Sequence, residues 1–68
     1  MSIRLNLCFD GVVMDDICAF GENEAEEILR SHSTNFSDQN EEIKRDWLAL
    51  GKRNDPIVTI EREVHHEQ

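Results

Sequence analysis

The chain has little of what defines several classes of small protein. Its 68 residues include two cysteines, Cys8 and Cys18, which are too few for a disulfide scaffold. No apolar run approaches the ~20 residues of a membrane-spanning helix, and no charged segment followed by an apolar run marks a secretory signal. The sequence therefore predicts a soluble, cytoplasmic protein with reduced thiols.

Basic residues are nearly absent from one long segment. Residues 10–42 hold ten acidic side chains against Arg30 alone, a net charge of −9, whereas the rest of the chain holds five acids and six bases, a net of +1. Lys and Arg are what bind nucleic acid and anionic membranes, so direct binding to either is not expected. A surface of this sign attracts basic partners instead.

The length limits the fold to one small domain. Sixty-eight residues lie near the lower limit for folding without a metal or disulfides. A core of this size leaves roughly 3–5 kcal/mol of net stability. We expect a single domain over residues 1–64, followed by a frayed polar tail over residues 65–68.

A β-hairpin is predicted at the beginning of the chain. Residues 3–9 alternate between apolar and polar side chains, which is typical of a half-buried strand. Asp10-Gly11 follows, and residues 12–14 are apolar again. An Asp-Gly pair between apolar runs is a strong hairpin signal. Cys8 falls on the polar side of the first strand.

The second strand contains an irregularity. If the strands pair directly across the turn, simple alternation places Asp16 on the core face. A bulge at Asp15-Asp16 would return Ile17 and Ala19 to that face. The alternative is a helix that begins near Asp16, but Gly21 would cost roughly 1 kcal/mol inside it. We expect the bulge, and the register around it stays open.

A first helix is predicted over residues 23–32. Asn23 is a suitable N-cap, and Glu26 stands three residues later, as in a capping box. Glu26 and Arg30 are spaced for an i,i+4 ion pair. A second helix is expected to begin at Ser37 or Asp38.

The second helix and a last strand complete the fold. Asp38 would cap the helix with Glu41 at its third position, and Gly51 would end it. Residues 57–64 alternate again and predict a strand. The element order is ββααβ, which indicates a two-layer α+β domain: a three-stranded, mainly antiparallel sheet with two helices on one face.

One local pattern resembles an enzyme motif. Cys8-Phe9-Asp10-Gly11 is similar to the Asp-x-Asp-Gly loop of haloacid-dehalogenase-like phosphatases, with Cys8 at the nucleophile position and Asp10 at the acid–base position. The first aspartate, which supports Mg²⁺ in that family, is missing. The parallel sheet of that fold also needs a longer chain, whereas a hairpin turn accounts for Asp10-Gly11 fully.

No other pattern predicts a catalytic or metal site. No spacing ties either cysteine to a histidine base, which nucleophilic catalysis requires. His65-His66-Glu67 lacks the paired short spacing of a zinc site. We therefore expect a non-enzymatic protein with no cofactor and no metal.

The acidic block, residues 10–42, is the remaining functional signal. Neighbouring carboxylates on a helix imitate the spacing of phosphates, and small acidic inhibitors from phages and mobile elements block restriction or CRISPR-type machinery in this way. We expect an inhibitor or modulator of a basic, nucleic-acid-handling protein that acts by nucleic-acid mimicry. The expected partner-binding residues are Asp15, Asp16, Glu22, Glu24, Glu26, Glu27, Asp38, Glu41 and Glu42. The competing interpretation is that these carboxylates only cap helices and solvate the surface.

An alternative function is assembly. The aromatics outside the first strand are Phe20, Phe36 and Trp47. A domain this small cannot bury every large side chain, and Trp47 is expected in the core. Exposed beside Phe36, it would instead anchor a homodimer or a docking contact. An edge strand could also pair with a second copy or with a partner chain. The sequence leaves the partner, the host process and the oligomeric state undetermined.

Overall fold

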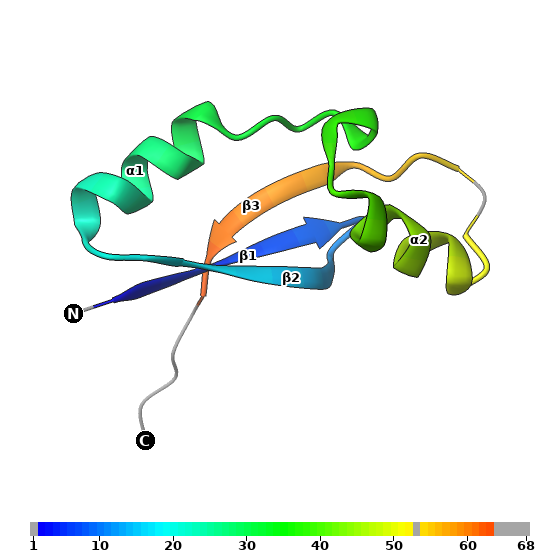
Figure 1. Ribbon diagram of the computed structural model, residues 1–68, viewed down its shortest axis with the longest axis horizontal. Coiled ribbons are helices and arrows are strands. Elements are labelled where there is room, and N and C mark those ends of the chain that lie inside the picture. The colour runs from blue at the N-terminus through cyan, green and yellow to red at the C-terminus, as the bar shows by residue number, and fades with distance from the viewer. Residues whose placement is uncertain (1, 53, 64–68) are drawn as a thin grey trace, which may run out of the picture.

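A computed structural model describes residues 2–52 and 54–63 of the chain. The three strands form one antiparallel sheet in the order β2-β1-β3, and both helices lie on the same face of it (Figure 1). The predicted ββααβ order and α+β class are confirmed. The elements are β1 (Ile3–Phe9), β2 (Val12–Ala19), α1 (Glu22–Ser31), the short 3₁₀ helix η1 (Phe36–Asp38), α2 (Glu41–Ala49) and β3 (Val58–Arg62).

The turn between β1 and β2 has the two residues that the sequence predicted. Asp10 and Gly11 have φ angles of 50° and 81°, the positive values that a two-residue type I′ turn requires at both positions. Phe9 pairs with Val12 across it. The Asp10 N–H donates to the Ile57 carbonyl at 2.9 Å, and Asp10 Oδ1 accepts from the Ile57 N–H at 2.8 Å. The turn is thus tied to the residue preceding β3.

A bulge interrupts β2, one residue earlier than predicted. Met14 has no partner in β1, so it is the extra residue, and the prediction of Asp15-Asp16 is wrong by one position. The reason is hydrophobic: Met14 packs half-buried against the core, while both aspartates stay exposed. Beyond the bulge Ile17 pairs with Leu5, as the prediction required.

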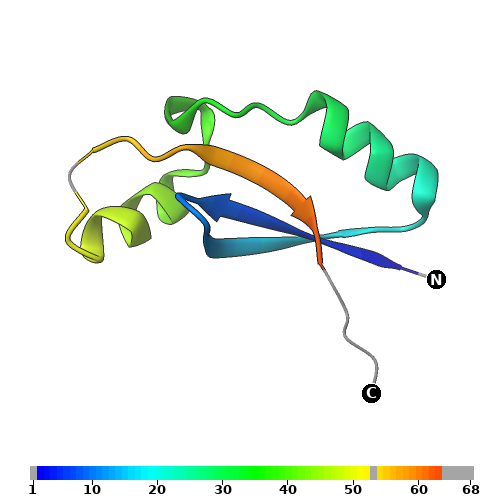
Figure 2. The same ribbon diagram turned by 180° about the vertical axis from the view of Figure 1, so that it is seen from behind.

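The core consists of two clusters arranged along the sheet. One lies under α2 and the other under α1, so each helix covers one half of the same sheet face (Figure 2). Ile60 of β3 packs against both clusters. The buried members of the α2 cluster are Leu7, Phe9, Trp47 and Val58; those of the α1 cluster are Leu5, Ala19 and Ala25.

Aromatic side chains fill the α2 cluster. Trp47 is 1% exposed and meets Phe9 edge-on, with ring centroids 5.7 Å apart, and Phe36 meets Phe9 similarly at 5.4 Å. Trp47 Nε1 donates to the Asn54 carbonyl at 3.3 Å, and Lys52 Nζ lies 5.7 Å from the indole centroid. Trp47 is therefore a core residue, as expected, and is not the exposed anchor of the assembly hypothesis.

Helix α1 begins earlier than the sequence indicated. Its N-cap is Gly21, so the prediction of Asn23 as N-cap is wrong. Glu24 at the third helical position accepts a hydrogen bond from the Phe20 N–H at 3.1 Å, which satisfies a donor just outside the helix. The strand leads directly into the helix through Phe20-Gly21, and this continuity explains the early start.

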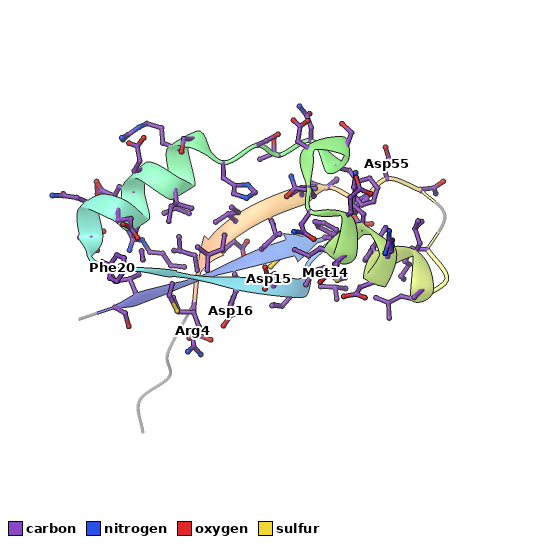
Figure 3. The ribbon with its side chains drawn as sticks, in the orientation of Figure 1. Arg4, Met14, Asp15, Asp16, Phe20 and Asp55 are labelled. Atoms are coloured by element: carbon purple, nitrogen blue, oxygen red, sulfur yellow. The ribbon has the colours of Figure 1, made fainter. Side chains whose placement is uncertain are left out.

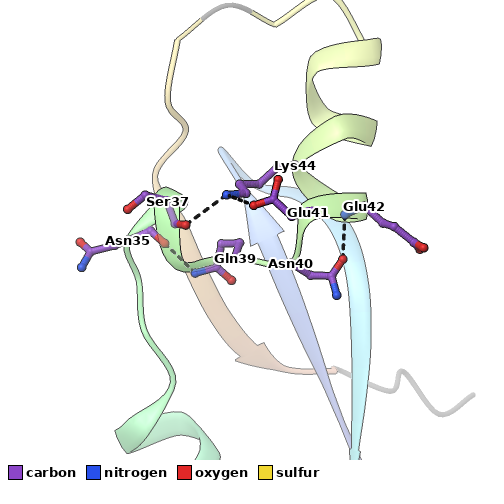
Figure 4. A network of polar contacts seen from close by, with 7 residues as sticks. All are labelled: Asn35, Ser37, Gln39, Asn40, Glu41, Glu42 and Lys44. Carbon is purple, nitrogen blue, oxygen red and sulfur yellow. Dashed lines mark hydrogen bonds and ion pairs between the residues drawn. The ribbon is translucent and has the colours of Figure 1, made fainter.

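Helix α2 begins later than predicted. Asn40 is its N-cap and accepts from the Glu42 N–H at 2.8 Å, so the predicted start at Ser37 or Asp38 is wrong (Figure 4). Gly51 has a φ of 85° just after the C-cap and ends the helix as predicted.

A buried amide separates η1 from α2. Gln39 is 6% exposed, and its Nε2 donates to the carbonyls of Ser33 and Asn35 at 2.9 and 2.8 Å. Phe36 packs against Phe9 from the same segment. The tertiary contact of Phe36 and the bonds of the Gln39 amide together hold residues 36–38 in a separate 3₁₀ turn, which capping signals do not reveal.

The strand β3 is shorter than the predicted 57–64. It runs antiparallel to β1, with Val58, Ile60 and Arg62 opposite residues of the helix-covered face, as the alternation indicated. Val64 and the tail at 65–68 lie outside the described residues. The opposite face of the sheet carries Arg4 and Cys8, and no described helix covers it.

Candidate partner-binding surface

All nine carboxylates of the predicted site are exposed, but they occupy three separate places. Asp15 and Asp16 lie on β2, four glutamates on α1, and Asp38, Glu41 and Glu42 on η1 and the start of α2. The helices cover opposite halves of the sheet in both views (Figures 1 and 2). The nine residues therefore do not form a single cluster.

Four of the nine carboxylates form ion pairs with basic side chains; the three arginines are exposed, whereas Lys44 is mostly buried. Arg30 pairs with Glu27 at 2.6 Å, so the predicted pair with Glu26 is wrong. The exposed pairs formed by the three arginines contribute about 0–1 kcal/mol each, so a partner can displace them at little cost. The four pairs are Arg4–Asp16, Arg30–Glu27, Lys44–Glu41 and Arg62–Glu22.

Two further carboxylates have local structural roles. Asp38 accepts from Ser33 Oγ at 2.7 Å and from Asn35 Nδ2 at 3.4 Å, and these hydrogen bonds hold its pKa below the ordinary 3.8. Glu24 accepts the Phe20 N–H, as described above. Capping and turn formation thus account for part of the acidic block.

Asp15, Glu26 and Glu42 have no such role. Within residues 2–52 and 54–63, their carboxylates form no ion pair or hydrogen bond with a side chain or the backbone. Figure 3 shows Asp15 beside Asp16 on β2, where Asp16 lies close to Arg4. The three free carboxylates come from three different elements, one on each.

Negative charge is concentrated on α1. That helix carries four glutamates and Arg30, a net charge of −3, whereas residues 41–57 carry four acids and four bases and are neutral. The neutrality of the second segment comes from Lys44, Arg45, Lys52 and Arg53, which follow the acidic block closely in sequence. The α1 half of the molecule is therefore the more negative one.

An exposed aromatic side chain adjoins α1. Phe20 is 87% exposed, the largest value among the large hydrophobic residues that the structure describes, and it lies between the end of β2 and the N-cap of α1 (Figure 3). The assembly hypothesis looked to Trp47 and Phe36 for exposed aromatics, and both pack against Phe9 instead. Phe20 was one of the three aromatics considered for an apolar surface, but alternation alone did not predict its exposure, because it follows β2 directly.

The two cysteines have different environments. Cys8 points to the uncovered face of the sheet, as expected, yet it is 4% exposed; burial, reinforced by Glu61, raises the pKa of its thiol. Cys18 is exposed. Residues 2–52 and 54–63 hold no group of three or more His, Cys, Asp or Glu side chains placed for a metal ion, and no pocket. His65 and His66 lie outside the described residues.

No helix in the described part of the chain has both the length and the apolar character needed to cross a membrane. Comparison with protein families, with curated proteins and with solved structures found no match to this chain.

Proposed function

We propose that this protein is a non-enzymatic binding domain that inhibits or modulates a basic, nucleic-acid-handling protein, with α1 as its contact surface. The observation that carries the proposal is the charge of α1. Its four glutamates are all exposed, Arg30 is its one basic residue, and the segment 41–57, which contains α2, is neutral overall.

The electrostatics of α1 suit a partner that normally binds phosphates. Carboxylates three or four residues apart on a helix lie ~5–6 Å from each other. On α1 this spacing relates Glu22 to Glu26 and Glu24 to Glu27, which gives two pairs of anionic groups. A groove lined with Lys and Arg, as in nucleic-acid-binding proteins, complements such paired carboxylates. Phage and mobile-element inhibitors of restriction or CRISPR-type machinery are the class of protein that uses this strategy.

Phe20 adds an apolar contact to the charged one. Aromatic residues surrounded by polar ones commonly dominate binding energy at interfaces. The hydrogen bond from the Phe20 N–H to Glu24 Oε1 holds the backbone at Phe20 against the first turn of α1. A partner that grips α1 would meet this side chain at the same time.

The test is a charge reversal confined to α1. Glu24, Glu26 and Glu27 changed to Lys should abolish capture of the partner from a lysate of the native host. The matched control changes Glu41, Glu42 and Asp46 to Lys, which alters the net charge equally but on α2. The control should retain capture, because screening over about 10 Å makes binding depend on local charge.

Two further measurements complete the test: the salt dependence of capture and its displacement by nucleic acid. Capture by the unaltered protein should weaken with each step of increasing salt, and duplex DNA or RNA should displace the captured protein, because both would compete for one basic groove. Capture that survives the α1 reversal, or that is lost equally in both variants, contradicts the proposal. Capture that nucleic acid does not displace contradicts the mimicry.

A further inference from the structure

The outer edge of β2 has backbone groups with no partner strand. Among the described strands β2 has one neighbour, β1, which separates it from β3 (Figure 1). Just beyond one end of β1, the Asp10 N–H donates to the Ile57 carbonyl at 2.9 Å. Near the other end, the Arg4 carbonyl accepts from the Glu63 N–H at 3.0 Å. Backbone groups alternate between the two edges of a strand, so even-numbered residues of β1 bond to β3 and odd-numbered ones bond to β2.

The same alternation gives β2 two residues whose backbone groups point outward. Ile17 pairs with Leu5, an odd-numbered residue of β1, so the N–H and C=O of Ile17 face β1. Those of its neighbours, Asp16 and Cys18, face away from the sheet. In the part of the chain that the structure describes, these outward groups form no hydrogen bond. They offer an added strand two donors and two acceptors.

The open part of this edge ends at a bulge on one side and at an occupied N–H on the other. Toward the turn, Met14 is the unpaired extra residue, and it interrupts the regular spacing of the backbone groups. Toward α1, the Phe20 N–H is the next outward donor, and Glu24 Oε1 already accepts it at 3.1 Å. Residues 15–19 are therefore the stretch along which a strand can be added.

The charges beside this edge favour a basic occupant. Residues 10–29 hold seven acids and no Lys or Arg. Asp16 pairs with Asn6 and so lies on the uncovered face of the sheet. Asp15 pairs with Leu7, which points to the helix-covered face. Both aspartates are exposed, so a basic side chain on either side of an added strand meets a carboxylate.

Two other arrangements are less favourable. A second copy of this chain carries a net charge of −8 and is repelled by the same carboxylates. The other edge of the sheet, β3, carries Glu61 and Arg62 and is neutral, so it does not select a basic segment. The occupant that fits the edge of β2 is an extended segment rich in Lys or Arg.

We propose that β2 binds an extended, basic segment of the partner protein, which joins the sheet as an added strand along residues 15–19. Binding by strand addition takes its affinity from main-chain hydrogen bonds and its selectivity from alternate side chains. Here the alternate side chains of the segment meet Asp16 on one face, and Asp15 and Ile17 on the other. The inference rests on the proposed function for the positive charge of the partner, and it adds a second contact beside α1.

The test uses a synthetic probe, a peptide with blocked ends and about eight residues in which valine and lysine alternate. Up to about 5 mM, this peptide should bind the unaltered protein reversibly, and at saturation amide exchange at Asp16 and Cys18 should slow about tenfold. Chemical shifts should change along residues 15–19 and stay constant in β3. The matched peptide has glutamate in place of every lysine and should produce neither effect, because the same carboxylates repel it.

Two variants at one position separate the main-chain contact from the side chain. Cys18→Pro removes an outward N–H, and an edge strand tolerates proline where the nitrogen faces solvent. It should weaken binding of the lysine peptide about tenfold, as expected for one lost hydrogen bond. Cys18→Ser keeps the N–H and a side chain of similar size, so it should bind like the unaltered protein. Circular dichroism checks that Cys18→Pro is folded, and the exchange measurement on the unaltered protein does not depend on that variant.

Unchanged amide exchange at Asp16 and Cys18 overturns the proposal, and it would leave the bulge and the aspartates as protection of the edge against pairing. So do shifts confined to α1 or to β3, equal binding of the glutamate peptide, or equal affinity of folded Cys18→Pro and Cys18→Ser. The reversal on α1 tests Glu24, Glu26 and Glu27, which Cys18→Pro leaves intact. Failure of the peptide to bind, with partner capture lost on the α1 reversal, refutes the edge contact alone, and the opposite pair of results refutes only the proposed function.

Discussion

Asp10 joins the hairpin turn to the residue preceding β3. Its substitution should destabilise the fold through two effects that can be measured separately: loss of a side-chain hydrogen bond and strain at a positive φ. Its carboxylate accepts the Ile57 N–H at 2.8 Å, and its backbone has a φ of 50°. Changing Asp10 to Asn keeps an oxygen acceptor and a residue that tolerates positive φ. Changing it to Gly keeps the backbone conformation alone, and changing it to Ala keeps neither.

The expected magnitudes follow from these two terms. Loss of an exposed hydrogen bond costs about 1 kcal/mol, and a non-glycine, non-Asx residue at positive φ costs about 1 kcal/mol more. Asp10→Gly should therefore lose about 1 kcal/mol and Asp10→Ala about 2 kcal/mol, while Asp10→Asn should change little. Against roughly 3–5 kcal/mol of total stability, the alanine variant should lose about half.

Urea unfolding followed by circular dichroism measures these differences. Asp15→Ala is the matched control, because Asp15 is an exposed aspartate whose carboxylate has no partner among the described residues. It should be neutral. If Asp10→Ala and Asp10→Gly unfold at the same urea concentration, backbone conformation does not contribute. If both match Asp15→Ala, the bond to Ile57 contributes nothing and the reasoning is refuted.

Two other predictions concern titratable groups. A thiol reagent at neutral pH should label exposed Cys18 in the folded protein and label Cys8 only on unfolding, because burial limits access and raises the Cys8 pKa; equal labelling rates by mass spectrometry would contradict this. The pKa of Asp38 is lowered by Ser33 and Asn35, so its contribution to stability is present above the ordinary 3.8 and lost as the pH falls below it. The difference in unfolding midpoint between the unaltered protein and Asp38→Asn should therefore shrink as the pH falls below 3.8. A difference that persists at lower pH would argue against this role of Asp38.

The parts of the fold that depend only on residues adjacent in the sequence were predictable from it. The Asp10-Gly11 turn needs two residues that accept positive φ, and strand alternation follows from burying one face. Gly51 likewise ends α2 through its own backbone preference. These signals are local and unaffected by the rest of the chain.

The errors arose where tertiary contacts override local preference. Asp38 is a good N-cap, yet Phe36 packs against Phe9 and Gln39 is buried, so the helix begins after Asn40. Likewise the bulge falls on Met14 because an apolar side chain gains more from the core than an aspartate does. Neither contact is visible to a rule that considers a few consecutive residues.

The acidic block was likewise predictable from the sequence only in part. Its charge was countable from the sequence, and every candidate carboxylate is exposed. Its distribution in space was not, because α1 and α2 lie over opposite halves of the sheet and Arg62 reaches Glu22 from β3. The exposure of Phe20 also depends on where the chain leaves the sheet.

The two core clusters are unequal, and this has a consequence for local unfolding. The α2 cluster contains the fully buried Phe9 and Trp47, whereas Ala25 is the one fully buried residue of α1, and Ile28 and Leu29 pack against its cluster only partly buried. Less buried apolar area means a lower free energy for opening that half of the domain. A ligand held by α1 would add its binding free energy to the half that opens most readily. Occupancy of the acidic helix and the rigidity of the domain would then be thermodynamically linked.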